Sequence, residues 1–125
     1  MHKTVLIVED EFLIAMDLKS ILERQGWRVI GPVASVAAAS RLLERELPSV
    51  ALLDVNVGNE LVTPVAEKLS SLNVPFAVAS AYDRPELVGG VVLAGAPNVG
   101  KPTPERRLLE VLTKLLEPHA LRPRT

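Results

Sequence analysis

The chain has 125 residues, of which 48% are hydrophobic and 23% charged, and its formal net charge is −1. This length and composition predict one globular domain and exclude a disordered tail protein. The lack of cysteine excludes disulfide scaffolds, thiolate metal sites and cysteine nucleophiles, and the balanced charge gives no electrostatic reason to expect a nucleic acid or membrane partner.

Short apolar runs alternate along the chain with longer stretches of mixed character. Polar residues do not interrupt most of these runs, which is typical of strands buried on both faces of a parallel sheet. The predicted strands are Val5–Val8, Val29–Val33, Val50–Leu53, Pro75–Ala79 and Pro97–Val99. Gly31 and Pro32 interrupt the second of them, and the fifth is short.

Between the runs, apolar residues recur every three or four positions, which is the spacing of one helix face. Several residues suited to helix ends lie in these stretches. They are Gly26 after the first helix, Ser35 as cap of the second, Asp83 as cap of the fourth with Pro85 and Glu86 in its first turn, Thr103 and Pro104 before the last, and Pro118 after it. Gly89 and Gly90 weaken the fourth helix.

Strands that alternate with helices predict right-handed βαβ units and an α/β fold with a parallel sheet. Ligands of such open sheets bind at the carboxyl ends of the strands. Glu9 and Asp10 follow the first predicted strand, Asp54 the third, Ser80 the fourth and Lys101 the fifth. Three acids at one edge repel one another, and a hard cation such as Mg²⁺ would offset this charge. Together, these acids, the Ser80 hydroxyl and the Lys101 ammonium could hold a phosphoryl group against a carboxylate nucleophile.

This arrangement resembles the response-regulator receiver domain of two-component signalling. The motifs that carry the resemblance are Val8-Glu9-Asp10-Glu11, Leu52-Leu53-Asp54-Val55-Asn56, Ala79-Ser80-Ala81 and Lys101-Pro102. Each motif alone is weak, but the four in order at predicted strand ends make a specific signal. The resemblance implies a doubly wound, flavodoxin-like three-layer sandwich with strand order 2-1-3-4-5. We expect the receiver domain over residues 1–118, followed by a short tail over 119–125.

The resemblance also implies a role for each residue of the site. Asp54 is the implied phosphoacceptor, Ser80 would donate to a phosphoryl oxygen, and Lys101 would pair with Asp54 and then with the phosphoryl group. The implied Mg²⁺ ligands are Glu9, Asp10, Asp54 and the backbone carbonyl of Asn56. The side chains of Asn56 and Tyr82 would flank the water that hydrolyses the acyl phosphate.

The implied phosphodonor is the phosphohistidine of a sensor histidine kinase or of a histidine phosphotransfer protein, and the signal would pass to a downstream protein target. We expect no enzyme activity beyond Mg²⁺-dependent self-phosphorylation and autodephosphorylation, no nucleic acid or membrane contact, and a monomer or weak homodimer. The longest apolar run falls far short of the roughly 18 residues of a membrane span, so a cytoplasmic protein is expected. If the chain is complete, it is a single-domain receiver; otherwise it is a fragment of a larger protein.

One position departs from the usual receiver pattern. Asn98 stands three residues before Lys101, where receivers usually carry an aromatic switch residue. The segment from Phe76 to Tyr82 is similar to a receiver subgroup that also lacks this aromatic. We therefore hypothesise that the signal travels through the weak fourth helix and Tyr82.

Three other interpretations compete with a phosphorylated receiver. The main alternative is a receiver-like interaction module that is never phosphorylated. The segment from Gly95 to Pro102 fits most of a nucleotide-binding phosphate loop, but Pro102 lacks the hydroxyl and the N–H that such loops use. A flavodoxin-like electron carrier would need a phosphate loop after the first strand, where Glu9, Asp10 and Glu11 would repel phosphate.

Overall fold

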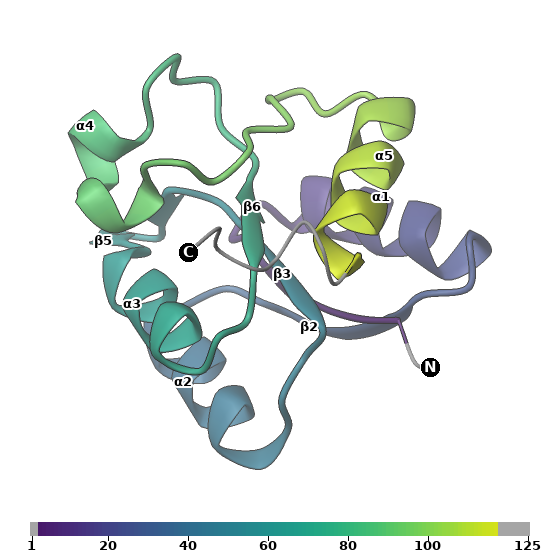
Figure 1. The fold of residues 1–125 in the computed structure, drawn as a ribbon, viewed down its shortest axis with the longest axis horizontal. Helices are drawn as coiled ribbons and strands as arrows, with labels where there is room; N and C mark the ends of the chain where they lie inside the picture. Colours follow the sequence, from purple (N-terminus) through teal and green to yellow (C-terminus); the bar gives the residue numbers. More distant parts are fainter. Residues whose placement is uncertain (1–2, 118–125) are drawn as a thin grey trace.

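Parallel strands form the centre of the computed structural model, which describes residues 3–117 (Figure 1). Helices α1 and α5 cover one face of the sheet, and α2 and α3 cover the other. The elements in chain order are β1 Thr4–Val8, α1 Phe12–Arg24, β2 Arg28–Val33, α2 Val36–Arg45, β3 Val50–Leu53, β4 Asn56–Val57, β5 Glu60–Leu61, α3 Thr63–Ser71, β6 Phe76–Val78, α4 Glu86–Gly89, the 3-10 helix η1 Val91–Leu93, and α5 Glu105–Leu116. The predicted stop at Pro118 and the predicted tail over 119–125 lie outside the described residues.

The strand order in the sheet is β2-β1-β3-β6, and all of its pairs are parallel. Val5 of β1 lies opposite Val29 of β2 and Val50 of β3, and Leu53 of β3 lies opposite Val78 of β6. This confirms the predicted doubly wound α/β fold, in which β6 is the fourth strand of the predicted order.

The fifth predicted strand, Pro97–Val99, is reduced to a single bridge between Asn98 and Val78. Val78 donates its N–H to the carbonyl of Pro97 at 2.8 Å and accepts from the N–H of Val99 at 2.8 Å. Pairing then stops, because Gly100 adopts a positive φ of 89° that turns the chain out of the extended conformation. The sheet therefore has an irregular edge beside β6.

The core consists of two apolar layers, one on each face of the sheet, because successive strand residues point to opposite faces. The layer beneath α1 and α5 includes Val5, Ile7, Leu52 and Ala77 from the strands. The layer beneath α2 and α3 includes Leu6, Val8, Leu53 and Val78. These strand residues are nearly inaccessible to solvent, so their burial on both faces matches the unbroken apolar runs of the sequence.

The helix ends confirm some predictions and correct one. The Ser35 hydroxyl accepts a hydrogen bond from the N–H of Ala38 at 3.1 Å, which confirms it as the cap of α2. The prediction that Asp83 caps the fourth helix is wrong, because α4 begins only at Glu86 and Pro85 stands directly before it. Helix α4 is only four residues long, as the weakness of this glycine-containing stretch suggested.

A short antiparallel hairpin follows β3 and is not among the strands predicted from the sequence. Strands β4 and β5 pair Asn56 with Leu61 and Val57 with Glu60. Gly58, whose φ is 65°, lies in the turn between them. The hairpin brings this turn back towards the end of β1, where the N–H of Gly58 donates to the side chain of Asp10.

Candidate functional site

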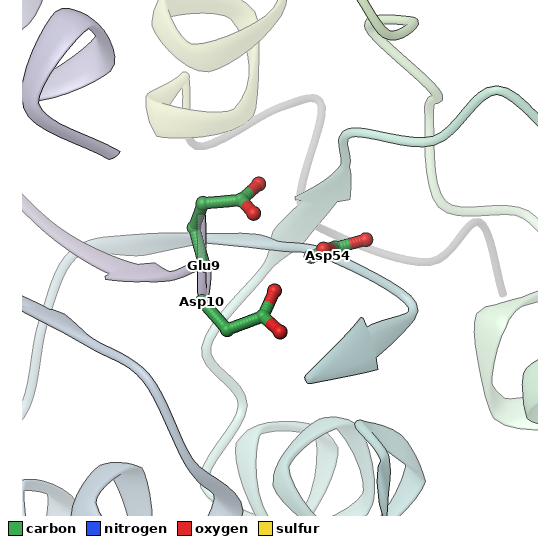
Figure 2. Close-up of side chains that lie close together, drawn as sticks. All are labelled: Glu9, Asp10 and Asp54. Carbon is green, nitrogen blue, oxygen red and sulfur yellow. The ribbon is translucent and has the colours of Figure 1, made fainter. Parts of the chain in front are cut away.

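The carboxyl ends of β1 and β3 bring three acidic side chains together (Figure 2). Glu9 and Asp10 follow β1, and Asp54 follows β3, its neighbour in the sheet. One carboxylate oxygen of each residue lies within 4.8 Å of the others. The backbone fixes this arrangement, because the N–H of Asp54 donates to the carbonyl of Val8 at 2.9 Å. The predicted acidic cluster is thus present in the structure.

Lys101 reaches the same cluster from the irregular edge of the sheet. Its Nζ lies 3.0 Å from Asp54 Oδ2, 3.1 Å from Glu9 Oε1 and 3.6 Å from Glu11 Oε1. The Lys101 side chain is only 18% exposed, so solvent screens these ion pairs less than it would at the surface. A single ammonium group therefore faces several carboxylates and offsets only part of their charge.

Glu9 is the most buried of the acids, with a side chain that is 2% exposed. Its Oε2 accepts hydrogen bonds from the N–H of Glu11 at 3.1 Å and from Lys101 Nζ at 3.3 Å. Its Oε1 is buried and accepts no hydrogen bond from the described residues, although the ammonium of Lys101 lies near it. Buried oxygens normally have a partner, so this atom is suited to a ligand that supplies one.

Burial has the largest effect on the pKa of Glu9. It raises the pKa of Glu9 above the ordinary value of 4.5, and the negative charge of Asp54 adds to this effect. The Glu11 N–H and Lys101 act in the opposite direction without cancelling it. For Lys101, burial lowers the pKa, but the hydrogen bonds to Asp54 and Glu9 outweigh burial and the pKa is raised. Lys101 is therefore a cation at neutral pH.

Asp10 is the exposed member of the cluster and is held by the hairpin. Its Oδ2 accepts a hydrogen bond from the N–H of Gly58 at 2.8 Å. This contact was not predicted from the sequence, although a glycine in a turn shortly after Asp54 is a signal for a close approach of the backbone. The ion pair between Lys101 and Glu11 was not predicted from the sequence either.

Ser80 and Asn56 lie at the same edge of the sheet but outside the acidic cluster. The buried Ser80 hydroxyl accepts from the N–H of Tyr82 at 2.9 Å and, among the described residues, makes no hydrogen bond to the acids. Asn56 Nδ2 donates to the hydroxyl of Tyr82 at 3.1 Å. The predicted roles of the Ser80 hydroxyl and of the Asn56 carbonyl stay predictions.

The fold and this site define a class of signalling domain. The chain belongs to the response regulator receiver domain family, whose model matches residues 5–113. Receiver domains are signalling modules of two-component systems rather than ordinary enzymes, and the family normally binds Mg²⁺ at an acidic pocket. The cluster of Glu9, Asp10 and Asp54 fits that ion, because it offers three carboxylates close together. One of their oxygens, Glu9 Oε1, is buried and accepts no hydrogen bond from the described residues.

Individual relatives agree with this assignment. The transcriptional regulatory protein PdtaR of Mycobacterium tuberculosis is 32% identical over 95 residues, which are 75% of this chain and 46% of PdtaR. The phyllosphere-induced regulator PhyR of Methylorubrum extorquens is 34% identical over 92 residues, 71% of this chain and 34% of PhyR. The chain thus matches less than half the length of these two relatives. The solution structure of SdrG from Sphingomonas melonis is 35% identical with a TM-score of 0.78, covering 93% of this chain and 98% of SdrG.

Within residues 3–117, no helix is both long enough and apolar enough to cross a membrane.

Proposed function

We propose that the chain is a phosphoacceptor receiver in a two-component phosphorelay. Asp54 accepts a phosphoryl group from the phosphohistidine of a sensor histidine kinase or a histidine phosphotransfer protein, and phosphorylation alters the contacts of the chain with a downstream protein. The observation that carries this proposal is the position of Asp54, which lies within the acidic cluster and 3.0 Å from the Lys101 ammonium.

The transfer needs a nucleophile and a means of offsetting charge. A carboxylate oxygen of Asp54 attacks phosphorus, the P–N bond of the phosphohistidine breaks, and the imidazole leaves with the bonding electron pair. Lys101 first pairs with Asp54 and then donates to the charged phosphoryl oxygens, and its raised pKa keeps it protonated throughout. Ser80, at the end of β6, supplies a hydroxyl donor to the same group.

The acidic cluster would hold Mg²⁺ during this transfer. The proposed ligands are Glu9, Asp10, Asp54 and the backbone carbonyl of Asn56. When bound, Mg²⁺ supplies a Lewis acid that polarises phosphoryl oxygens and reduces charge repulsion at the nucleophile. Glu9 contributes a buried carboxylate, and Asp10 contributes one that the Gly58 N–H orients.

The surface beside the site supports a protein rather than a small molecule as the phosphodonor. Phe12 and Leu13 begin α1 directly after Glu11, and they are 72% and 80% exposed. Large apolar side chains that are exposed together beside a site are typical of protein contacts. We propose that this domain binds other proteins and contacts neither nucleic acid nor membrane. It would act as a monomer or weak homodimer.

Phosphate-affinity gel electrophoresis after incubation with acetyl phosphate and Mg²⁺ tests this function. We expect a retarded band for the wild-type chain, no such band for Asp54→Asn, and loss of the wild-type band when a chelator replaces Mg²⁺. Asp83→Asn is the matched control, because Asp83 is exposed and lies outside the acidic cluster. Absence of the band from the wild type, with a histidine kinase as donor as well, would favour the unphosphorylated interaction module.

A further inference from the structure

The Asn98 side chain makes an unusual set of hydrogen bonds at the irregular edge of the sheet. Its Oδ1 accepts from the N–H of Ser80 at 3.1 Å and from the N–H of Gly100 at 2.9 Å. Its Nδ2 donates to the carbonyl of Tyr82 at 3.0 Å. Two N–H donors can face only the amide oxygen and a carbonyl can face only the amide nitrogen, so these partners fix the orientation of the amide group.

One of these bonds replaces a backbone bond of the missing fifth strand. Val78 exchanges hydrogen bonds with Pro97 and Val99, as a parallel pair requires. If pairing continued, the next N–H, that of Ser80, would bond the backbone carbonyl of Val99. It bonds Asn98 Oδ1 instead. The side chain of Asn98 therefore completes the edge of the sheet where the backbone has turned away.

The same amide joins the two segments that contact the phosphoryl group in the proposed function. Ser80 is bonded to it directly, and Gly100 is the residue next to Lys101. Phosphorylation of Asp54 would draw the Ser80 hydroxyl and the Lys101 ammonium towards new acceptor oxygens. Both movements shift groups that are attached to Asn98, so its hydrogen bonds must adjust.

The third bond leads from the site towards α4. Tyr82 opens the segment that runs to α4 and η1, in which Gly90 has a φ of 100° and Leu87 and Val91 are exposed. The bond from Asn98 to Tyr82 is solvent-exposed, whereas the two bonds to Asn98 Oδ1 are partly buried. Water replaces a lost hydrogen-bond partner most readily where the bond is exposed. The bond to the Tyr82 carbonyl is therefore the first to break when Ser80 and Lys101 move.

We propose that Asn98 is a positioning residue that couples phosphorylation of Asp54 to the segment 82–93. In the unphosphorylated protein its amide holds this segment against the Lys101 loop, and phosphorylation releases the bond to the Tyr82 carbonyl. The inference rests on the proposed function of Asp54, and it gives the position of the usual aromatic switch a polar role.

Amide hydrogen exchange followed by NMR tests the coupling, with beryllofluoride and Mg²⁺ as the mimic of the phosphorylated state. In the wild type, we expect beryllofluoride to accelerate exchange in residues 84–93 by about five- to tenfold, the equivalent of one lost hydrogen bond. Asn98→Asp keeps an acceptor for Ser80 and Gly100 but cannot donate to Tyr82. Its segment 84–93 should already exchange about five- to tenfold faster without the mimic and gain less than about twofold from it.

The matched control is Asn73→Asp, which makes the same chemical change at an exposed position before the start of β6. This control should respond to beryllofluoride as the wild type does. A purely structural role for Asn98 predicts equal acceleration by the mimic in wild type and Asn98→Asp, and that result would overturn the proposal. The ¹⁹F signal of bound beryllofluoride shows separately whether the site is loaded. Its absence from the wild type would overturn the proposed function itself.

A measurement on the wild type alone keeps the proposal testable if Asn98→Asp does not fold. The side-chain NH₂ resonances of Asn98 should shift when beryllofluoride binds, because one of these hydrogens loses the Tyr82 carbonyl. The NH₂ resonances of Asn73 should stay in place. Unshifted Asn98 resonances in a protein that shows bound ¹⁹F signal would contradict the release of this bond.

Discussion

The two sides of the acidic cluster are built in different ways. On one side, β1 and β3 are buried along their whole length and pair in regular register, and Glu9 and Asp54 follow them directly. On the other side, β6 has three residues, α4 has four, and the fifth strand is a single bridge. Lys101 and Ser80 come from this second, irregular side.

The difference separates the fixed groups of the site from those that can respond. Apolar burial in the two core layers holds the carboxylates, and it cannot change without loss of packing throughout the sheet. In the segment 80–101, Leu93 and Val99 are buried in the core layers, and the other contacts include several side-chain hydrogen bonds that are exposed. Elements with few buried contacts open at a lower free energy than core strands do. The regular side therefore fixes the position of Asp54, the proposed phosphoacceptor, and the irregular side is the part that can change with its phosphorylation.

The largest expected effect is on the regular side. Leu52 of β3 is 1% exposed and packs in the layer beneath α1 and α5. Leu52→Ala should lower the free energy of unfolding by about 2–5 kcal/mol, because it removes buried apolar atoms and leaves a cavity. Urea unfolding followed by circular dichroism measures this loss.

The contrasting variant on the irregular side is Val91→Ala in η1. Val91 is 84% exposed, so its truncation should change the free energy of unfolding by less than about 0.5 kcal/mol. Losses of similar size for the two variants would contradict the contrast between the two sides of the site.

A smaller effect concerns the pH dependence of Mg²⁺ binding. Because burial raises the pKa of Glu9, the folded state binds this proton more tightly than the unfolded state does. The stability that this bound proton adds to the folded state is fully present when the pH is below 4.5, the ordinary pKa of a glutamate. It is lost as the pH rises through the raised pKa of Glu9. Mg²⁺ needs the ionised carboxylate, so its affinity should increase over the same window, by up to about tenfold per pH unit. Mg²⁺ titrations followed by NMR between pH 4.5 and 8 measure this slope.

Glu9→Gln should flatten the slope, because the amide does not titrate, and should also weaken binding at neutral pH. Glu11→Gln is the control, since Glu11 also lies near Lys101 but its side chain is 62% exposed. If Glu9→Gln and the wild type show the same slope, another group controls the pH dependence.

The sequence predicted the regular side of the site more completely than the irregular side, from which it placed Lys101 beside Asp54. The runs Val5–Val8 and Val50–Leu53 have no polar interruption, and acids follow them immediately, so strand ends and site residues are marked together. Parallel pairing then brings Glu9 and Asp54 side by side. The local sequence contains all that is needed for this inference.

The irregular side and the hairpin formed by β4 and β5 depend on contacts between residues far apart in the chain. The bond from Ser80 to Asn98 spans 18 positions, and the bond from Asp10 to the Gly58 N–H spans 48. Neither produces a periodic pattern, and strands of two residues such as β4 and β5 have no period to detect. The prediction of Asp83 as a cap is wrong for a local reason: Pro85, two residues later, directly precedes the helix and leaves Asp83 outside it.

The smallest expected effect on function tests a bond that joins the two sides. The Tyr82 hydroxyl accepts from Asn56 Nδ2, and Asn56 follows the regular strand β3. Tyr82→Phe removes this bond, which is solvent-exposed, so stability should fall by about 0.5 kcal/mol. The resemblance to receiver domains implies that the pair flanks the approach of water to the acyl phosphate, and we propose that role here. Dephosphorylation of Asp54 should therefore become about two- to fivefold faster, which the decay of the retarded gel band after removal of the donor measures.

A double-mutant cycle shows whether the bond itself is responsible. Asn56→Ala removes the other partner and keeps the backbone carbonyl that is proposed to bind Mg²⁺. If the two side chains act as a pair, Asn56→Ala should accelerate dephosphorylation about as much as Tyr82→Phe, and the double variant should add little. Independent, additive effects would mean that each side chain acts on water alone. The two sides of the site would then communicate through Asn98 and the backbone rather than through this bond.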